Sequence, residues 1–508
     1  MSRTIPFALA VAIALAAIPL ALGHNAHSVW YDEALSHKVA SEPDVASLVH
    51  RTMELRGYPP LYFMAVRLGL EWRDDTVVLR IVSVLCGALA VLAVFLLARA
   101  VAGSGVGVIA ALLLPLTPGF FRYFVDGNAH TLFALTSCLS LLALLRALRS
   151  DRRRDWWLYA AATIVGLFTH TLFVFHVAGH LVAAVAWRAP WREWAGVGAA
   201  WRAQRRLVLT WLGVLVPWAA FVAFYAASSG RVDPPNPERL LSPVTLLLVP
   251  ALYVGSLSAS PLTQLLLWPL LQLLGAWVGW RRWRKELVFL LLAMAVPLLA
   301  ITAFTRLFFI FFPYRFGLGI FPVSVVVAAL AVAWVGRGRW ADLAKWARAI
   351  GAVAVGGTAL YLATGAAWFA TAPPDAFSYQ DWEGSRRVLA QRMRPDDALL
   401  LGGGELSETP FLYHYAGPVA PVVVGSDGEL AATIVSLAAS PGGPPPRLWL
   451  VIASLANENQ TIRNLTSKHW PTLDERVTSL RRALDAAGYQ VDAVTELKRV
   501  VVVGTSRR

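Results

Sequence analysis

Long apolar runs recur along the chain and are separated by short polar turns. A helix needs roughly 20 apolar residues to cross the hydrocarbon core of a bilayer, and on that measure we predict about eleven transmembrane spans. The predicted spans begin near Ile5, Val77, Val106, Thr131, Trp156, Thr171, Leu207, Ser260, Leu287, Gly317 and Ala349. Of the 508 residues, 57% are hydrophobic and 15% are charged, whereas a soluble protein carries about 25% charged residues. The sequence therefore predicts a polytopic α-helical membrane protein.

Arginine and lysine gather in alternate turns between these spans. They cluster at 146–154, 188–206, 281–285 and 337–348, after the fourth, sixth, eighth and tenth predicted spans. The positive-inside rule makes this side of the membrane cytoplasmic. We therefore predict an integral protein of the plasma or inner membrane, with a cytoplasmic N-terminus and with everything after about Thr371 outside. The formal net charge of +14 then follows largely from topology, and no nucleic-acid partner is expected.

The composition changes near residue 370. The residues that follow are richer in Asp, Glu, Gly and Pro and contain no spanning run. Strand-like runs at 396–404, 419–424, 447–453 and 500–503 accompany a predicted helix at 473–487. Strands that alternate with helices indicate a small α/β domain. We therefore divide the chain into a transmembrane domain, residues 1–370, and an extracytoplasmic α/β domain, residues 371–508.

The first outer loop, residues 23–76, contains two adjacent carboxylates. Asp32 and Glu33 follow directly after Trp30 and Tyr31. Trp and Tyr favour the membrane interface, where the ring meets lipid and the polar edge meets water. We therefore expect the carboxylates at the depth of a lipid phosphate, with Asp32 partly exposed.

Two helices are predicted farther along this loop, at 44–55 and 61–72, lying on the membrane face. Pro59 and Pro60 separate them, because proline cannot continue a helix and forces the residue before it toward an extended backbone. A rigid break in the loop is the expected result.

A few more charged and polar side chains fall near the predicted outer face. A charge at membrane depth is expensive to bury and is a functional-site hypothesis by default. The candidates are Asp126 and His130 after the third span, His170 in the turn between the fifth and sixth, and Arg306, Tyr314 and Arg315 before the tenth. By the predicted topology, all of them lie on the same side of the membrane as Asp32.

Simpler interpretations exist for several of these residues. Asp32 and Glu33 could form a favourable charge pair at the N-terminus of a helix. Asp126 could cap the fourth span, and His170 could be a bystander in its turn. Arg306 could be an interface residue whose charged head reaches toward water.

The motifs resemble those of the GT-C glycosyltransferases, which include the protein O-mannosyltransferases and the bacterial aminoarabinose transferase that modifies lipid A. Such proteins show an Asp-Glu pair in the first outer loop and then a His-Pro-Pro-Leu-Tyr type motif. Here the pair stands in 30–34, Trp-Tyr-Asp-Glu-Ala, and the second motif in 58–62, where Tyr58 takes the place of the His. Later motifs of the family are similar to Asp126, Thr169-His170 and Tyr314-Arg315-Phe316. A C-terminal extracytoplasmic domain is also common in this family.

The resemblance implies an enzyme that uses a polyprenyl-phosphate-linked sugar as donor. The acceptor hydroxyl of a glycan, lipid or protein must lose a proton as it attacks the anomeric carbon, and a carboxylate can take that proton. Asp32 is the expected general base, and a single base suffices for an inverting transfer. Departure of the lipid phosphate requires positive charge, for which Arg315 is the first candidate and Arg306 the second.

The remaining candidates receive supporting roles. We expect Glu33 to orient the acceptor and Asp126 to bind the acceptor, a metal or His170. Glu33, Asp126, His130 and His170 also offer ligands for a divalent metal, and no other cofactor is expected. The residues expected to contact the acceptor, or to belong to the loops around it, are Tyr31, Tyr58, His130, His170 and Tyr314.

Two other classes of function compete with this hypothesis. A transporter or flippase for lipid-linked saccharides would show paired internal repeats and broken helices in matching positions, and the sequence has no such repeat. A structural envelope protein that acts through its C-terminal part would tolerate loss of Asp32.

A reporter that is active only in the cytoplasm tests the predicted topology. Fused after Arg508, it should give no signal, because the C-terminus is predicted outside. Inserted into the basic turn 281–285, the same reporter should be active. A strong signal from the C-terminal fusion would overturn both the topology and the proposed position of the site.

Overall fold

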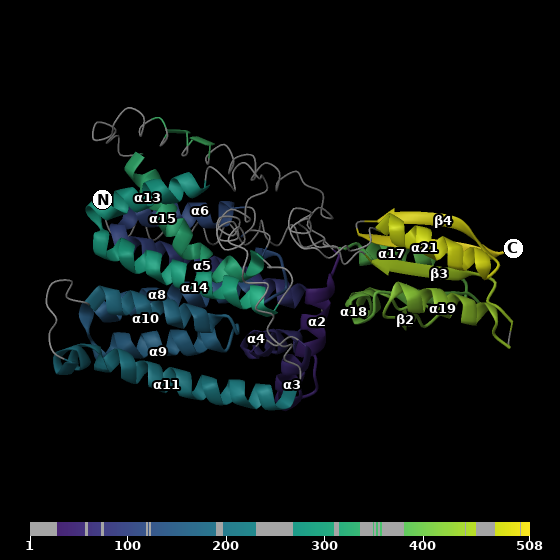
Figure 1. Ribbon diagram of the computed structural model, residues 1–508, viewed down its shortest axis with the longest axis horizontal. Coiled ribbons are helices and arrows are strands. Elements are labelled where there is room, and N and C mark those ends of the chain that lie inside the picture. The colour runs from purple at the N-terminus through teal and green to yellow at the C-terminus, as the bar shows by residue number, and fades with distance from the viewer. Residues whose placement is uncertain are drawn as a thin grey trace. The chain divides into compact units, whose positions relative to one another are not determined.

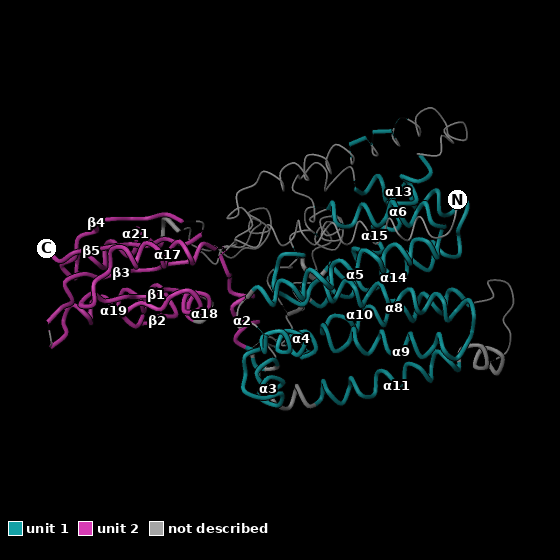
Figure 2. Tube along the Cα trace, turned by 180° about the vertical axis from the view of Figure 1, so that it is seen from behind, with its two compact units in different colours: residues 1–23, 39–372 teal, residues 24–38, 373–508 magenta. Residues whose placement is uncertain are grey.

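The computed structural model describes residues 28–55, 59–72, 76–117, 120, 123–188, 197–229, 268–308, 314–335, 349, 352–353, 356–357, 380–441, 443–453, 473–497 and 499–508. The chain divides into two compact units (Figure 2). Unit 1 comprises residues 1–23 and 39–372, and unit 2 comprises residues 24–38 and 373–508. The sequence predicted that the whole first loop belongs to the transmembrane domain. Instead, the segment that carries Asp32 and Glu33 groups with the C-terminal residues.

Unit 1 is built from helices, most of which run side by side (Figure 1). Its elements are α3 (Val45–Leu55), α4 (Leu61–Leu70), α5 (Thr76–Ala102), α6 (Ser104–Leu116), α8 (His130–Ser150), α9 (Arg153–Leu167), α10 (Phe173–Arg188), α11 (Val197–Ser229), α13 (Trp268–Arg282), α14 (Arg284–Phe308), the 3-10 helix η3 (Tyr314–Gly319) and α15 (Phe321–Val335).

Several of these helices suit a membrane. Among the described residues, four segments are long and apolar enough to cross one: Val77–Ala102, His130–Ser150, Arg205–Ala223 and Arg284–Phe304. Shorter apolar helices are Leu61–Leu70, Ser104–Leu116, Phe173–Arg188 and Phe321–Val335. A helical membrane protein is thus confirmed. The count of about eleven spans stays a prediction, because the span near Ile5 and most of the one near Ala349 lie outside the described residues.

Three of the basic turns, at 146–154, 188–206 and 281–285, meet at one end of unit 1. Asp151 follows α8 and pairs with Arg188 at 3.1 Å and with Arg206 at 2.9 Å, both from the next basic cluster along the chain. Glu286, in the first turn of α14, pairs with Arg149 at 2.7 Å. Turns that the sequence predicts on one side of the membrane are therefore neighbours in the structure.

The two helices predicted in the first loop are present as α3 and α4. Pro60 precedes the first residue of α4, and the amide of Leu61 donates a 3.1 Å hydrogen bond to the carbonyl of Phe168 in the turn between α9 and α10. Tyr62 and Phe63 are fully buried against α5 residues that include Leu79. The Pro-Pro motif is thus packed against the helical bundle.

Unit 2 contains a five-stranded sheet of order β2-β1-β3-β5-β4. Its strands are β1 (Ala398–Gly402), β2 (Val422–Val424), β3 (Leu448–Ala453), β4 (Tyr489–Leu497) and β5 (Val500–Arg507). β1 pairs in parallel with β2 and β3, whereas β5 pairs antiparallel with β3 and β4. β4 lies outside every predicted strand, because it is an edge strand with exposed polar residues at Gln490, Asp492 and Glu496.

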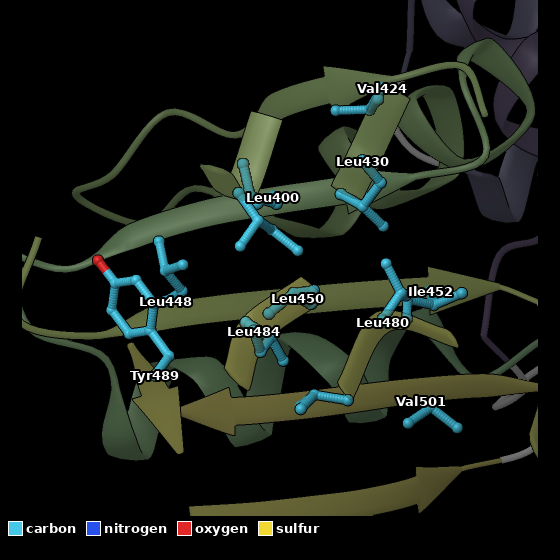
Figure 3. Packing of buried hydrophobic residues seen from close by; sticks show 12 residues of the cluster. Leu400, Val424, Leu430, Leu448, Leu450, Ile452, Leu480, Leu484, Tyr489 and Val501 are labelled. Carbon is cyan, nitrogen blue, oxygen red and sulfur yellow. The ribbon is translucent and has the colours of Figure 1, made fainter. Parts of the chain in front are cut away.

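Helices cover both faces of this sheet. α17 (Trp382–Arg392) and α18 (Glu405–His414) pack on one face through Trp382 and Phe411. α19 (Asp427–Ala438) and α21 (Leu473–Ala486) pack on the other. Figure 3 shows Leu480 and Leu484 over the strand residues of that second face.

Candidate active site

A buried turn precedes α8 in unit 1. Asp126 is 3% exposed, Asn128 1% and His130 1%. The amide of Asn128 bonds the carbonyl of Asp126 at 2.7 Å, and the amide of Ala129 bonds the side-chain oxygen of Asn128 at 2.8 Å. These two hydrogen bonds of Asn128 form the turn and fix the backbone of Asp126 within it. Asp126 is not the cap of α8, since the residue before that helix is Ala129.

A serine ties this turn to the motif in the first loop. The hydroxyl of Ser83, on α5, donates to the carbonyl of Asn128 at 3.1 Å. The same hydroxyl lies 3.3 Å from the hydroxyl of Tyr62, which also donates to the carbonyl of Leu79. Tyr62 is the last residue of the Tyr-Pro-Pro-Leu-Tyr motif. Two motifs separated in sequence are thus joined through one buried hydroxyl.

The turn with His170 packs against the start of α8. The rings of His170 and Phe133 stack, with centres 4.4 Å apart, and the centres of His170 and His130 lie 6.3 Å apart. His170 Nδ1 accepts a 3.2 Å bond from the amide of Leu172, which fixes the ring over its own turn. His130 and His170 are therefore neighbours in the structure.

The 3-10 helix η3 reaches the same region. A Cβ placed on Gly319 would lie 2.6 Å from His176 Nε2 and 2.6 Å from the ring of Phe133. Only a glycine permits this approach of η3 to α8 and α10. The backbone of Tyr314 and Arg315 belongs to η3, so it lies in the same six-residue helix as this contact.

Some of the predicted site residues are only partly described. The side chains of Arg306, Tyr314 and Arg315 lie outside the described part, as does all of Tyr58. Arg306 belongs to the last turn of α14. The phosphate-binding roles expected for Arg306 and Arg315 stay predictions.

Asp32 and Glu33 belong to unit 2. They lie in the first turn of α2 (Tyr31–Ala40), which agrees with the alternative that they form a charge pair at a helix N-terminus. Successive residues of a helix point about 100° apart, so Asp32 and Glu33 face different directions, as expected. The expected partial exposure is wrong: Asp32 is 4% exposed and Glu33 0%, while Tyr31 is half-buried.

Arg80 is a buried charged residue that the sequence analysis missed. It is 2% exposed and lies near the start of α5. Its spacing from Ser83 and Gly87 places all three on one helix face. That face packs on the turn before α8, because Ser83 bonds Asn128 and a Cβ on Gly87 would lie 2.4 Å from Phe124. An arginine at the start of a predicted span was the available signal.

The metal hypothesis receives no geometric support. Among the described residues, no group of three or more His, Cys, Asp or Glu side chains is close enough to hold a metal ion. His176 and His180 have metal-like spacing on α10, but His176 packs between Phe133 and Phe173. The Nδ1 atom of His180 lies 3.4 Å from the hydroxyl of Tyr159.

Comparison with known proteins points to one fold. Residues 58–221 match the family described as dolichyl-phosphate-mannose-protein mannosyltransferase. ArnT from Cupriavidus metallidurans bound to undecaprenyl phosphate superposes with a TM-score of 0.57 at 15% identity, covering 99% of this chain and 98% of that one. The chain has the fold of the GT-C glycosyltransferases. The fold that the sequence predicted is thereby confirmed.

Two further solved structures are also similar to this chain. ArnT from the same organism in the apo state gives a TM-score of 0.54 at 15% identity, with 98% and 97% of the two chains covered. An oligosaccharyltransferase from Archaeoglobus fulgidus tethered with an acceptor peptide gives 0.48 at 13% identity, covering 83% of this chain and 64% of that one. No curated protein matches the sequence.

Removing the Ser83 hydroxyl should loosen the candidate site. Ser83→Ala leaves Tyr62 and the carbonyl of Asn128 without this partner in a buried position, which typically destabilises a protein by about 1–3 kcal/mol. We expect a lower melting temperature in detergent. Ser137→Ala is the matched control: Ser137 is a buried serine of α8 whose hydroxyl has no hydrogen-bond partner among the described residues. Equal effects from both variants would contradict this role of Ser83.

Proposed function

We propose that the protein transfers a sugar from a polyprenyl-phosphate donor to an acceptor hydroxyl at the outer face of the membrane. Two comparisons support this donor class. The matched family is described by a dolichyl-phosphate-linked sugar, and the ArnT structure with the same fold was crystallised with undecaprenyl phosphate. Both lipids join a long isoprenoid chain to a phosphate.

The main support for the proposal is a set of buried polar groups without hydrogen-bond partners. They lie near the start of α8, where the turn of His170 and the helix η3 pack. Among the described residues, Asn128 Nδ2, Thr131 Oγ1 and His176 Nε2 are buried and make no hydrogen bond. Leaving such a group unsatisfied costs about 1–3 kcal/mol, and native proteins rarely tolerate it. Hydroxyl-rich sugars and phosphates offer the donors and acceptors that these groups lack. A polar ligand is therefore the expected occupant of this end of unit 1.

The chemistry assigned to the site is a single displacement. Asp32 takes the proton of the acceptor hydroxyl while the hydroxyl oxygen forms a bond to the anomeric carbon. The bond between that carbon and the phosphate oxygen breaks, and the polyprenyl phosphate leaves with the electron pair. The anomeric configuration is inverted, because attack and departure occur on opposite faces of the sugar.

The leaving phosphate requires a cation that stays in place during the reaction. Arg315 is proposed for this role, because a guanidinium presents parallel N–H donors that match two phosphate oxygens. Arg306 is proposed as a second cation for the donor. Glu33 and Asp126 are proposed as catalytic residues beside Asp32, Glu33 by orienting the acceptor. The proposed acceptor or loop residues are Tyr31, Tyr58, His130, His170 and Tyr314.

Asp32→Asn tests the base directly. The amide keeps the size of the side chain but cannot accept the proton, and loss of a general base typically slows a reaction about 10²–10⁴-fold. Donor binding should survive, since the phosphate is assigned to Arg315. Sugar transfer from a purified lipid-linked donor is measured together with the melting temperature, because Asp32 is buried.

Glu33→Gln is the matched control for Asp32→Asn. It removes a neighbouring buried carboxylate and should slow transfer less. A stable Asp32→Asn protein with near-normal transfer would refute the assignment and make Asp126 the leading candidate for the base.

Arg315→Lys separates the shape of the cation from its charge. Lysine keeps the charge but loses the fork that binds phosphate at two points. Because a charge-assisted hydrogen bond contributes about 1.5–3 kcal/mol, we expect the KM for the donor to rise about tenfold or more with the fold intact. Arg306→Lys provides the comparison at the second position. If Lys at position 315 serves as well as Arg in a donor titration, Arg315 does not bind the phosphate through a fork.

A further inference from the structure

The residues just before the Asp32–Glu33 helix are bound by the C-terminal part of unit 2. The amide of Val29 donates a 3.1 Å hydrogen bond to His414 Nε2. The hydroxyl of Ser28 accepts a 3.1 Å bond from the amide of Glu383 and lies 3.4 Å from His414 Nε2. Ser28 and Val29 are both buried, at 8% and 4% exposure. These contacts bridge more than 350 residues of sequence.

Glu383 determines which ring nitrogen of His414 donates a hydrogen bond and which one accepts. The hydrogen bond from Arg386 is the main cause that lowers the pKa of the Glu383 carboxyl, with its burial opposing. An ionised carboxylate only accepts hydrogen bonds, and it lies 3.3 Å from His414 Nδ1. We therefore assign the ring proton to Nδ1. In the neutral ring Nε2 is then an acceptor, which is what the amide of Val29 requires.

A second contact lies one helical turn beyond Asp32 and Glu33. The ring of His37, on α2, meets the edge of Tyr413 with centres 5.3 Å apart and planes at 75°. Tyr413 directly precedes His414 at the end of α18. The C-terminal domain thus contacts the chain on both sides of Asp32 and Glu33, with Ser28 and Val29 before them and His37 after.

We propose that His414 and Glu383 form a latch with Ser28 and Val29 that positions the helix of Asp32 and Glu33 for sugar transfer. The latch gives the C-terminal domain a role in the reaction itself. Its importance for transfer rests on the proposed function, because it acts through Asp32. Misplacing a reacting group by about 1 Å can slow a reaction about 10²-fold, so a few hydrogen bonds outside the site can control the rate.

Hydrogen exchange and kinetics test the latch together. His414→Ala removes the acceptor for Val29 and the partner of Glu383. We expect exchange of the amides in 29–36 to accelerate about three- to tenfold, the effect of one typical hydrogen bond. Exchange in the strands β1 and β3 should stay slow, which shows that the domain is folded. The kcat of transfer should fall about tenfold, with little change in the KM for the donor.

Three further variants separate positioning from general damage. His414→Gln can still accept from Val29 and donate to Glu383, and should restore most of the protection and the rate. Ser28→Ala removes the acceptor for the Glu383 amide and should act in the same direction as His414→Ala. Leu412→Ala, at an exposed position of the same helix, should change neither measurement.

The outcomes distinguish failure of the latch from failure of the proposed function. Unchanged exchange of 29–36 in both His414→Ala and Ser28→Ala would overturn the latch, even if Asp32→Asn abolishes transfer. Faster exchange with unchanged kcat would overturn its role in positioning. If Asp32→Asn leaves transfer intact, the proposed base fails, whereas the exchange result still tests the contact.

Discussion

Buried backbone groups at the end of a helical bundle must form their hydrogen bonds within the protein. The candidate site in unit 1 depends on how the turn before α8 forms them. In the turn before α8, the side-chain oxygen of Asn128 accepts a hydrogen bond from the amide of Ala129, and the hydroxyl of Ser83 donates one to the carbonyl of Asn128. Because a buried unpaired group is costly, these bonds fix the turn relative to α5. The position of Asp126 and His130 follows from that arrangement.

Two further contacts join segments at this end of unit 1. Leu61 bonds the turn of His170 through the carbonyl of Phe168, and Gly319 lets η3 pack against α8 and α10. The motif of the first loop, the His170 turn and the backbone around Arg315 are thereby held by the same small set of contacts. Basic turns occupy the opposite end of α8, where Asp151 and Glu286 pair with arginines. The motif residues and the basic turns thus lie at different ends of one helical bundle.

The individual helices could be predicted from the sequence better than the tertiary contacts between them. Hydropathy located α5, α8 and α14, because membrane burial requires long apolar runs. The Pro-Pro break between α3 and α4 followed from backbone geometry. The contact between Ser28 and His414 could not be predicted, since no local pattern links residues 386 positions apart. Asp32 was expected to be partly exposed on the basis of its aromatic neighbours, and its burial depends on tertiary contacts that the pattern does not contain.

A structure of the full chain with undecaprenyl phosphate bound is the most direct test of the central claim. The phosphate should lie at the end of unit 1 where η3 meets α8. Arg315 should contact the phosphate, and buried polar groups such as Asn128 should face the bound headgroup. Density for the phosphate at mid-membrane depth, away from these residues, would contradict it and would favour a transporter of lipid-linked saccharides.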